Sequence, residues 1–199
     1  MRPSALLFAA ALVAAPAAAL AQSPPPPPGS ANQTVVAQGQ IQMVGIAPDA
    51  CVLNAPQLSS AYNVTVGDDS SARTTSVTIN QMIDTNTLQA VPAAVDLSFP
   101  LICSGPNRVT VTSARGGMYL NGTATPAPMF TDHVSYTFNV QWAGQQAQGA
   151  TATNQNVQID STDGANGRLY LSIQIGGQAE RLFAGTYSDA LTVDVEPVS

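Results

Sequence analysis

Residues 134–142 read VSYTFNVQW, and they are the most regular stretch of the 199-residue chain. Hydrophobic residues stand at every second position, and Ser, Thr, Asn and Gln fill the places between them. Side chains alternate between the two faces of a β-strand, so this period of two predicts a strand with one buried face. The predicted buried residues are Val134, Tyr136, Phe138, Val140 and Trp142.

The same alternation recurs on both sides of this stretch. The residues that share one face in the other predicted strands are Val95, Leu97, Phe99, Leu101 and Cys103; Val109 and Val111; Leu169, Leu171, Ile173 and Ile175; and Leu191, Val193 and Val195. Weaker patterns predict strands at residues 62–66, 76–83 and 157–160. Pro100 falls on the polar face of its segment, which predicts an edge strand or a bend because proline has no N–H for the ladder.

No stretch has a convincing helical period, and Gly, Pro, Asn and Asp clusters separate the short strands. This combination is typical of an all-β sandwich of the immunoglobulin-like type. The sequence therefore predicts a single domain in which the alternating apolar faces of two sheets meet.

The start of the chain predicts export. A basic start at Arg2, an apolar run and an Ala-x-Ala site predict a signal peptide over residues 1–21. Residues 22–33 contain five consecutive prolines and predict an extended linker. The β-sandwich domain is expected over residues 34–199, beginning with a strand at about 34–46. Its apolar face carries Val35, Ala37, Gly39, Ile41 and Met43.

Export makes the two cysteines informative. Cys51 and Cys103 are an even pair in an oxidising compartment, which favours a disulfide. A metal site is the weaker alternative, because two isolated cysteines and the single histidine, His133, lack the spacing of metal ligands.

Composition and motifs argue against several functions. The net charge is −6, there is no lysine, and the six arginines are scattered, so neither nucleic acid nor an anionic membrane surface is an expected partner. His133 lies on the polar face of its strand, where we expect it to be solvated, and no nucleophile motif such as G-x-S-x-G is present. We therefore expect no enzyme activity, no catalytic residue, no metal and no cofactor.

The end of the chain has a distinctive pattern, AGTYSDALTVDV, which contains Gly185. Tyr187 precedes the last predicted strand and is placed to hydrogen-bond back across a corner, as in a tyrosine corner. Asp189 is placed to bind turn amides. The chain stops four residues after Val195, where an immunoglobulin-like domain normally has one more strand. A missing strand would leave an apolar groove and an unpaired edge.

This ending resembles that of the spore coat protein U domain family and of the subunits of archaic chaperone–usher pili. Further carriers of the resemblance are I-A-P-D-A-C-V around Cys51, F-P-L-I-C-S-G around Cys103 and Y-x-F-x-V-Q-W-A-G from Tyr136. The resemblance covers residues 34 to 197.

The resemblance implies a pilin-type sandwich that lacks its final strand. A periplasmic chaperone first lends a strand, and at an outer-membrane usher the N-terminal strand of the next subunit replaces it. The chain would then be a structural pilus subunit that passes through the periplasm to the cell surface and supports adhesion or biofilm formation.

Two alternatives remain open at this stage. The segment that contains Val35, Ala37, Gly39, Ile41 and Met43 is a donor strand for a neighbour, part of the protein's own first strand, or both, with the donor part ending before Pro48. The chain itself is either such a subunit or a self-complete secreted sandwich that binds carbohydrate or protein.

Overall fold

The computed structural model describes residues 45–69, 74–123 and 127–198. The chain divides into two compact units, Met1–Gly45 and Ile46–Ser199, and the strands lie in the second. The predicted signal peptide, linker and N-terminal strand, with Val35, Ala37, Gly39, Ile41 and Met43, lie outside the described residues.

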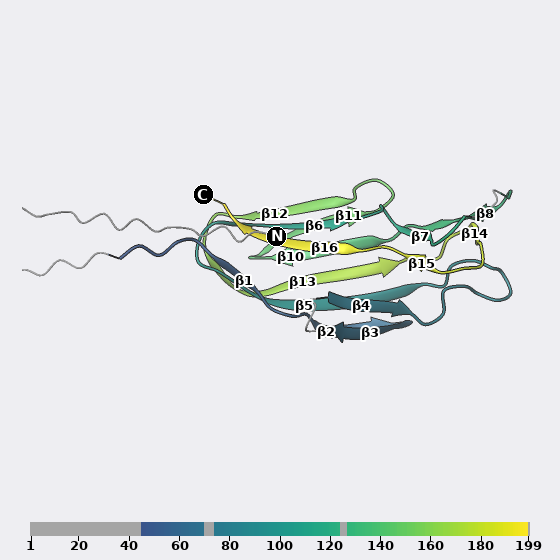
Figure 1. The fold of residues 1–199 in the computed structure, drawn as a ribbon, viewed down its shortest axis with the longest axis horizontal. Coiled ribbons are helices and arrows are strands. Elements are labelled where there is room, and N and C mark those ends of the chain that lie inside the picture. The colour runs from purple at the N-terminus through teal and green to yellow at the C-terminus, as the bar shows by residue number, and fades with distance from the viewer. Residues whose placement is uncertain (1–44, 70–73, 124–126, 199) are drawn as a thin grey trace, which may run out of the picture. The chain divides into compact units, whose positions relative to one another are not determined.

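The described residues form strands and no helix (Figure 1). The strands are β1 (Cys51–Leu53), β2 (Gln57–Tyr62), β3 (Val64–Asp69), β4 (Thr74–Ile79), β5 (Ala93–Cys103), β6 (Asn107–Ser113), β7 (Met118–Leu120), β8 (Phe130–Thr131), β9 (His133–Val134), β10 (Thr137–Trp142), β11 (Gln145–Ala150), β12 (Asn156–Ser161), β13 (Ala165–Ile175), β14 (Arg181–Leu182), β15 (Tyr187–Ser188) and β16 (Leu191–Pro197). Within this part of the chain, no segment is a helix long and apolar enough to cross a membrane.

The first sheet has the order β1-β5-β13-β10-β11, and β2 pairs with β5 beyond the end of β1. Its two longest strands, β5 and β13, pair antiparallel along their whole length, from Ala165 opposite Cys103 to Ile175 opposite Ala93. The five residues of β5 that the alternation predicts to be buried are all buried, with Phe99 the most exposed of them at 9%. Ala93 and Ser98 of the same strand are buried as well. The sequence pattern is therefore confirmed for the centre of this sheet.

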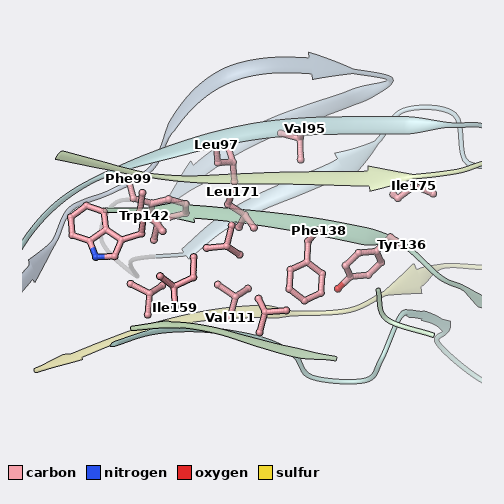
Figure 2. Packing of buried hydrophobic residues seen from close by; sticks show 14 of the residues in the cluster. Val95, Leu97, Phe99, Val111, Tyr136, Phe138, Trp142, Ile159, Leu171 and Ile175 are labelled. Carbon is pink, nitrogen blue, oxygen red and sulfur yellow. The ribbon is translucent and has the colours of Figure 1, made fainter. Parts of the chain in front are cut away.

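The second sheet has the order β12-β6-β16 and packs against the first. Val109 and Val111 of β6 and Val157 and Ile159 of β12 are buried. Figure 2 shows that side chains from the two layers meet between them, with Val111 and Ile159 on one side and Leu97 and Leu171 on the other. The all-β sandwich that the sequence predicts is confirmed.

Trp142 occupies the core, as its position in the alternation predicts. Its side chain is 2% exposed, and its indole N–H donates to Asn107 Oδ1 at 2.8 Å. Asn107 is fully buried, and its amide donates to the carbonyls of Gly105 and Asp163. A buried Trp requires such an acceptor, because leaving its N–H unpaired costs about 1–3 kcal/mol.

Cys51 and Cys103 form a disulfide. They are directly opposite each other on the antiparallel strands β1 and β5, so the bond joins the first described strand to the centre of the sheet. The predicted disulfide is therefore present.

We expect this disulfide to contribute about 4 kcal/mol to stability. The cysteines are 52 residues apart, and closing a loop of that length reduces the entropy of the unfolded chain by roughly this amount. Replacing both cysteines with serine should lower the free energy of unfolding accordingly, as measured by urea titration. Mass spectrometry of the unreduced protein should find no free thiol, and two free thiols in the folded chain would contradict the assignment.

The prediction that Pro100 lies on an edge strand was wrong. β5 is not an edge strand, since it pairs with β13 on one side and with β1 and β2 on the other. Pro100 lies level with the gap between β1 and β2, and its carbonyl accepts from Asn54 N at 2.9 Å. The N–H and C=O of a strand residue point the same way, so the missing N–H faces the gap, where no ladder partner is lost.

The weaker strands were predicted with the wrong bounds. The predicted strand at residues 62–66 is divided at Asn63, whose φ of 56° no strand residue adopts. The Asn63 side chain donates to the carbonyls of Gln81 and Pro92 and accepts from Gln81 N, which also ends β4 at Ile79 instead of residue 83. Asparagine tolerates this conformation because its short side chain bonds locally.

Candidate functional site

The two sheets of the sandwich differ in width. The first is five strands across, and the second has three. On one side β11 lies next to β12, and on the other side β1 approaches β16. The narrower sheet therefore ends at β16, and β1 at the edge of the first sheet contacts it.

Within the described residues, β16 pairs with β6 and with no strand on its other side. Two hydrogen bonds fix which main-chain groups face β6: Ala114 N donates to Ala190 O, and Val198 N donates to Pro106 O. Because main-chain groups alternate along an antiparallel strand, even-numbered residues face β6 and odd-numbered ones face away. The N–H and C=O groups of Leu191, Val193 and Val195 therefore point to the free side.

The side chains of the same three residues face the core. Val193 is opposite Val111, and Val195 is opposite Val109, and cross-strand partners share a face. Val109 and Val111 are 1% exposed, whereas the β16 residues are only half-buried. The inner face of the sandwich is thus covered over β6 and uncovered along β16.

The edge of the first sheet that β1 and β2 form also has inward-facing side chains that are incompletely covered. Leu58 on β2 pairs with Leu97, which is 5% exposed, so both face inward. Leu58 is nevertheless 51% exposed. Leu53 on β1 is half-buried and packs against the core. We call this region the open edge: the free side of β16 together with Leu53, Leu58, Leu191, Val193 and Val195.

A carboxylate fixes the point at which the chain enters β16. Asp189 precedes the strand and accepts five hydrogen bonds. The donors are the hydroxyls of Ser113 (2.6 Å) and Tyr136 (2.7 Å) and the main-chain N–H groups of Ala190 (2.8 Å), Arg115 (3.0 Å) and Gly117 (3.2 Å). These groups come from β6, the turn after it and the segment before β10, so Asp189 ties both sheets to the start of β16.

Burial raises the pKa of the Tyr136 hydroxyl well above its usual range, and the hydrogen bond to Asp189 raises it further. Tyr136 therefore remains protonated and a donor at physiological pH. Its ring is buried in the core, as the alternation of residues 134–142 predicts.

Tyr187 forms the corner contact that the sequence suggests. Its hydroxyl donates to Phe183 O at 3.0 Å and lies 3.3 Å from Thr131 O, and burial raises its pKa. Gly185 has a φ of 152°, and a Cβ there would lie 2.3 Å from the Leu120 side chain, so this position requires glycine.

We expect Tyr187→Phe to lower the free energy of unfolding by about 1 kcal/mol, the net contribution of one hydrogen bond. The ring keeps its packing, so the loss should appear in the urea midpoint without a change in slope. Tyr170→Phe is the matched control, because the Tyr170 side chain is exposed. Equal stability of the two variants would show that the hydrogen bond of the Tyr187 hydroxyl does not stabilise the fold.

The structure places the residues predicted for the C-terminal motif in two groups. Gly185, Tyr187 and Asp189 shape the corner before β16, while Leu191, Val193 and Val195 line the open edge. Sequence reasoning missed Ser113, Tyr136 as a hydroxyl donor, and Leu58. The first two meet Asp189 from more than 50 residues away, and Leu58 lies in a segment without alternation.

The His133 side chain is less exposed than the sequence predicts. It is half-buried, its ring stacks on Tyr119 at 5.1 Å between centroids, and its Nε2 lies 2.9 Å from Ser135 Oγ. Across residues 45–69, 74–123 and 127–198, no three His, Cys, Asp or Glu side chains gather as metal ligands do.

Comparison with known proteins identifies no family for this chain. No family model matches the chain, and no curated protein matches it. Among solved structures it is similar to a chain from a chaperone–tip adhesin complex of CFA/I fimbriae biogenesis, at 13% identity and a TM-score of 0.36. The match covers 75% of this chain and 43% of that one, so this protein spans less than half of its length. A likeness this slight assigns neither family nor function.

Proposed function

We propose that the chain is an exported, non-enzymatic structural subunit of a surface fibre, and that a strand from a neighbouring subunit completes its sandwich. The observation that carries the proposal is the open edge: Leu191, Val193 and Val195 expose part of their inward side chains and direct their main-chain groups to the free side of β16. An edge of this kind accepts a β-strand.

An added strand would pair the free main-chain groups of β16 and also cover its exposed inward side chains. Its main chain would pair with the free N–H and C=O groups of β16, and its alternate side chains would cover the exposed inner face. The N-terminal segment 34–46 has the required alternation, with Val35, Ala37, Gly39, Ile41 and Met43 on one face. Burying the Val, Ile and Met side chains contributes about 5–8 kcal/mol before ordering costs.

The partners in this proposal are neighbouring copies, a periplasmic chaperone that shields the open edge, and an outer-membrane usher that exchanges the chaperone for the next subunit. The disulfide fits passage through an oxidising compartment. The assembled fibre would lie at the cell surface and support adhesion or biofilm formation.

The N-terminal segment provides the direct test. Removing residues 22–44 should abolish polymerisation, while the truncated chain still accepts a peptide of residues 34–46. Gly39→Leu should also reduce polymerisation strongly, because a large side chain at a shallow pocket keeps the two main chains apart. Gln40→Leu is the matched control, since residue 40 falls on the polar face of the predicted alternation.

Size-exclusion chromatography and thermal melting separate the two roles of the segment. Loss of polymerisation with an unchanged melting temperature supports a donor strand. Unfolding of both altered chains, with unchanged polymerisation of the material that survives, would show that the segment belongs to the protein's own core. A stable monomer that never assembles would favour a self-complete binding domain.

A further inference from the structure

The outer face of the first sheet carries a pocket that the proposed assembly does not use. It has a volume of about 430 Å³ and lies where β5 and β10 begin and β11 and β13 end. Small-molecule sites commonly have volumes of about 300–1,000 Å³. The pocket is therefore large enough for a small ligand.

A single row of cross-strand neighbours forms its floor. From β2 to β11 the row runs Tyr62, Ala94, Gln174, Thr137, Ala150. Cross-strand partners share a face, and Ala93 and Val95 on either side of Ala94 are buried in the core, so this row faces outward. At the usual strand spacing the row is about 19 Å long.

The chemistry of the row is specific. The two alanines leave room above the sheet, and the Tyr62 ring, 63% exposed, stands at one end. Among the described residues, the hydroxyl of Tyr62, the amide of Gln174 and the hydroxyl of Thr137 have no hydrogen-bond partner, so all three are available to a ligand. None of the twelve residues that line the pocket is charged.

We infer that this pocket binds a neutral saccharide of about two sugar rings. One face of a pyranose ring presents C–H groups that stack on an aromatic ring, and its hydroxyls bond to amides and alcohols. An apolar floor with one exposed tyrosine, one amide and one hydroxyl matches both requirements. The absence of charge from the lining residues excludes a favourable ion pair with a sialylated or phosphorylated sugar.

The inference goes beyond the proposed assembly role and is independent of it. The Tyr62 side chain faces outward, whereas the side chains of the open edge face inward. Tyr62→Ala should therefore leave polymerisation unchanged. A failure of saccharide binding would leave the strand-addition proposal intact. Likewise, a failure of strand addition would leave the saccharide proposal intact.

The test is titration of the full secreted chain with neutral disaccharides, namely cellobiose, maltose, lactose and N,N′-diacetylchitobiose, followed by ligand-observed NMR. At least one should bind saturably. Tyr62→Ala should weaken that binding roughly tenfold, Gln174→Ala should weaken it severalfold, and Tyr62→Phe should nearly preserve it because the ring remains.

Tyr170→Ala is the matched control, because Tyr170 is 48% exposed on the outer face of the same sheet and does not line this pocket. It should leave binding unchanged. The inference is overturned if no disaccharide binds saturably, if Tyr62→Ala and Tyr170→Ala have the same effect, or if a peptide of residues 22–33 or sialyllactose binds the pocket in preference to every neutral disaccharide.

Discussion

We expect Val193→Asp to abolish the uptake of an added strand and Thr192→Asp to leave it almost intact. Both residues lie in the middle of β16 and are replaced by the same charged side chain. Val193 faces inward opposite Val111, and Thr192 is exposed on the outer face. A strand laid on the open edge would bury a carboxylate at residue 193 among apolar groups, and an unpaired buried charge costs several kcal/mol.

Binding of a fluorescent peptide of residues 34–46 to the secreted chain measures this difference. We expect at least a hundredfold loss of affinity for Val193→Asp and less than a threefold change for Thr192→Asp. Val193→Ala serves as a second variant if the aspartate variant is recovered poorly. Equal affinities for the two aspartate variants would show that the strand is not added at this edge.

We expect Asp189→Asn to lower the free energy of unfolding by about 3 kcal/mol, although the two side chains have nearly the same shape. Both carboxylate oxygens accept from donors: Oδ2 from Ser113, Tyr136 and Gly117, and Oδ1 from Arg115 and Ala190. An amide has one acceptor oxygen, so its NH₂ group must face one of these sets of donors. The hydroxyls can turn to accept from this NH₂ group, but a main-chain N–H cannot. One orientation therefore leaves Gly117 N without its acceptor and the other leaves Arg115 N and Ala190 N without theirs, and these unpaired donors account for most of the loss.

Urea unfolding of the chain with its disulfide intact provides the measurement. Asp194→Asn on the exposed face of β16 is the matched control and should change stability by less than about 0.5 kcal/mol. If Asp189→Asn were as stable as this control, Asp189 would not hold the start of β16 in place.

Alternation predicted the centre of the fold because the burial of a strand face is a local property of the sequence. Phe138, Val140 and Leu169 lie in the core for the reason that their spacing indicates. Alternation did not predict the position of Pro100, because its tolerance in a central strand depends on a gap between β1 and β2 that the sequence near Pro100 does not encode.

The open edge was anticipated from the immunoglobulin-like pattern and from a resemblance, and not from alternation. A half-buried Val193 and a buried Val111 have the same local pattern, and they differ in how many strands lie beside them. Leu58 carries no alternation at all and is placed by its pairing with Leu97. The partners of Asp189 are equally remote, since a carboxylate before a strand predicts turn amides but not the hydroxyls of Ser113 and Tyr136.

Hydrogen exchange at the β16 amides tests the central claim most directly, because adjacent residues are expected to behave oppositely. In the unassembled chain, the amides of Thr192 and Asp194 should exchange slowly because they face β6, and those of Leu191, Val193 and Val195 should exchange fast. Assembly should slow the second group roughly hundredfold and leave the first unchanged. If the Val193 amide exchanged at the same rate before and after assembly, the open edge would not be the site at which a neighbouring strand is added.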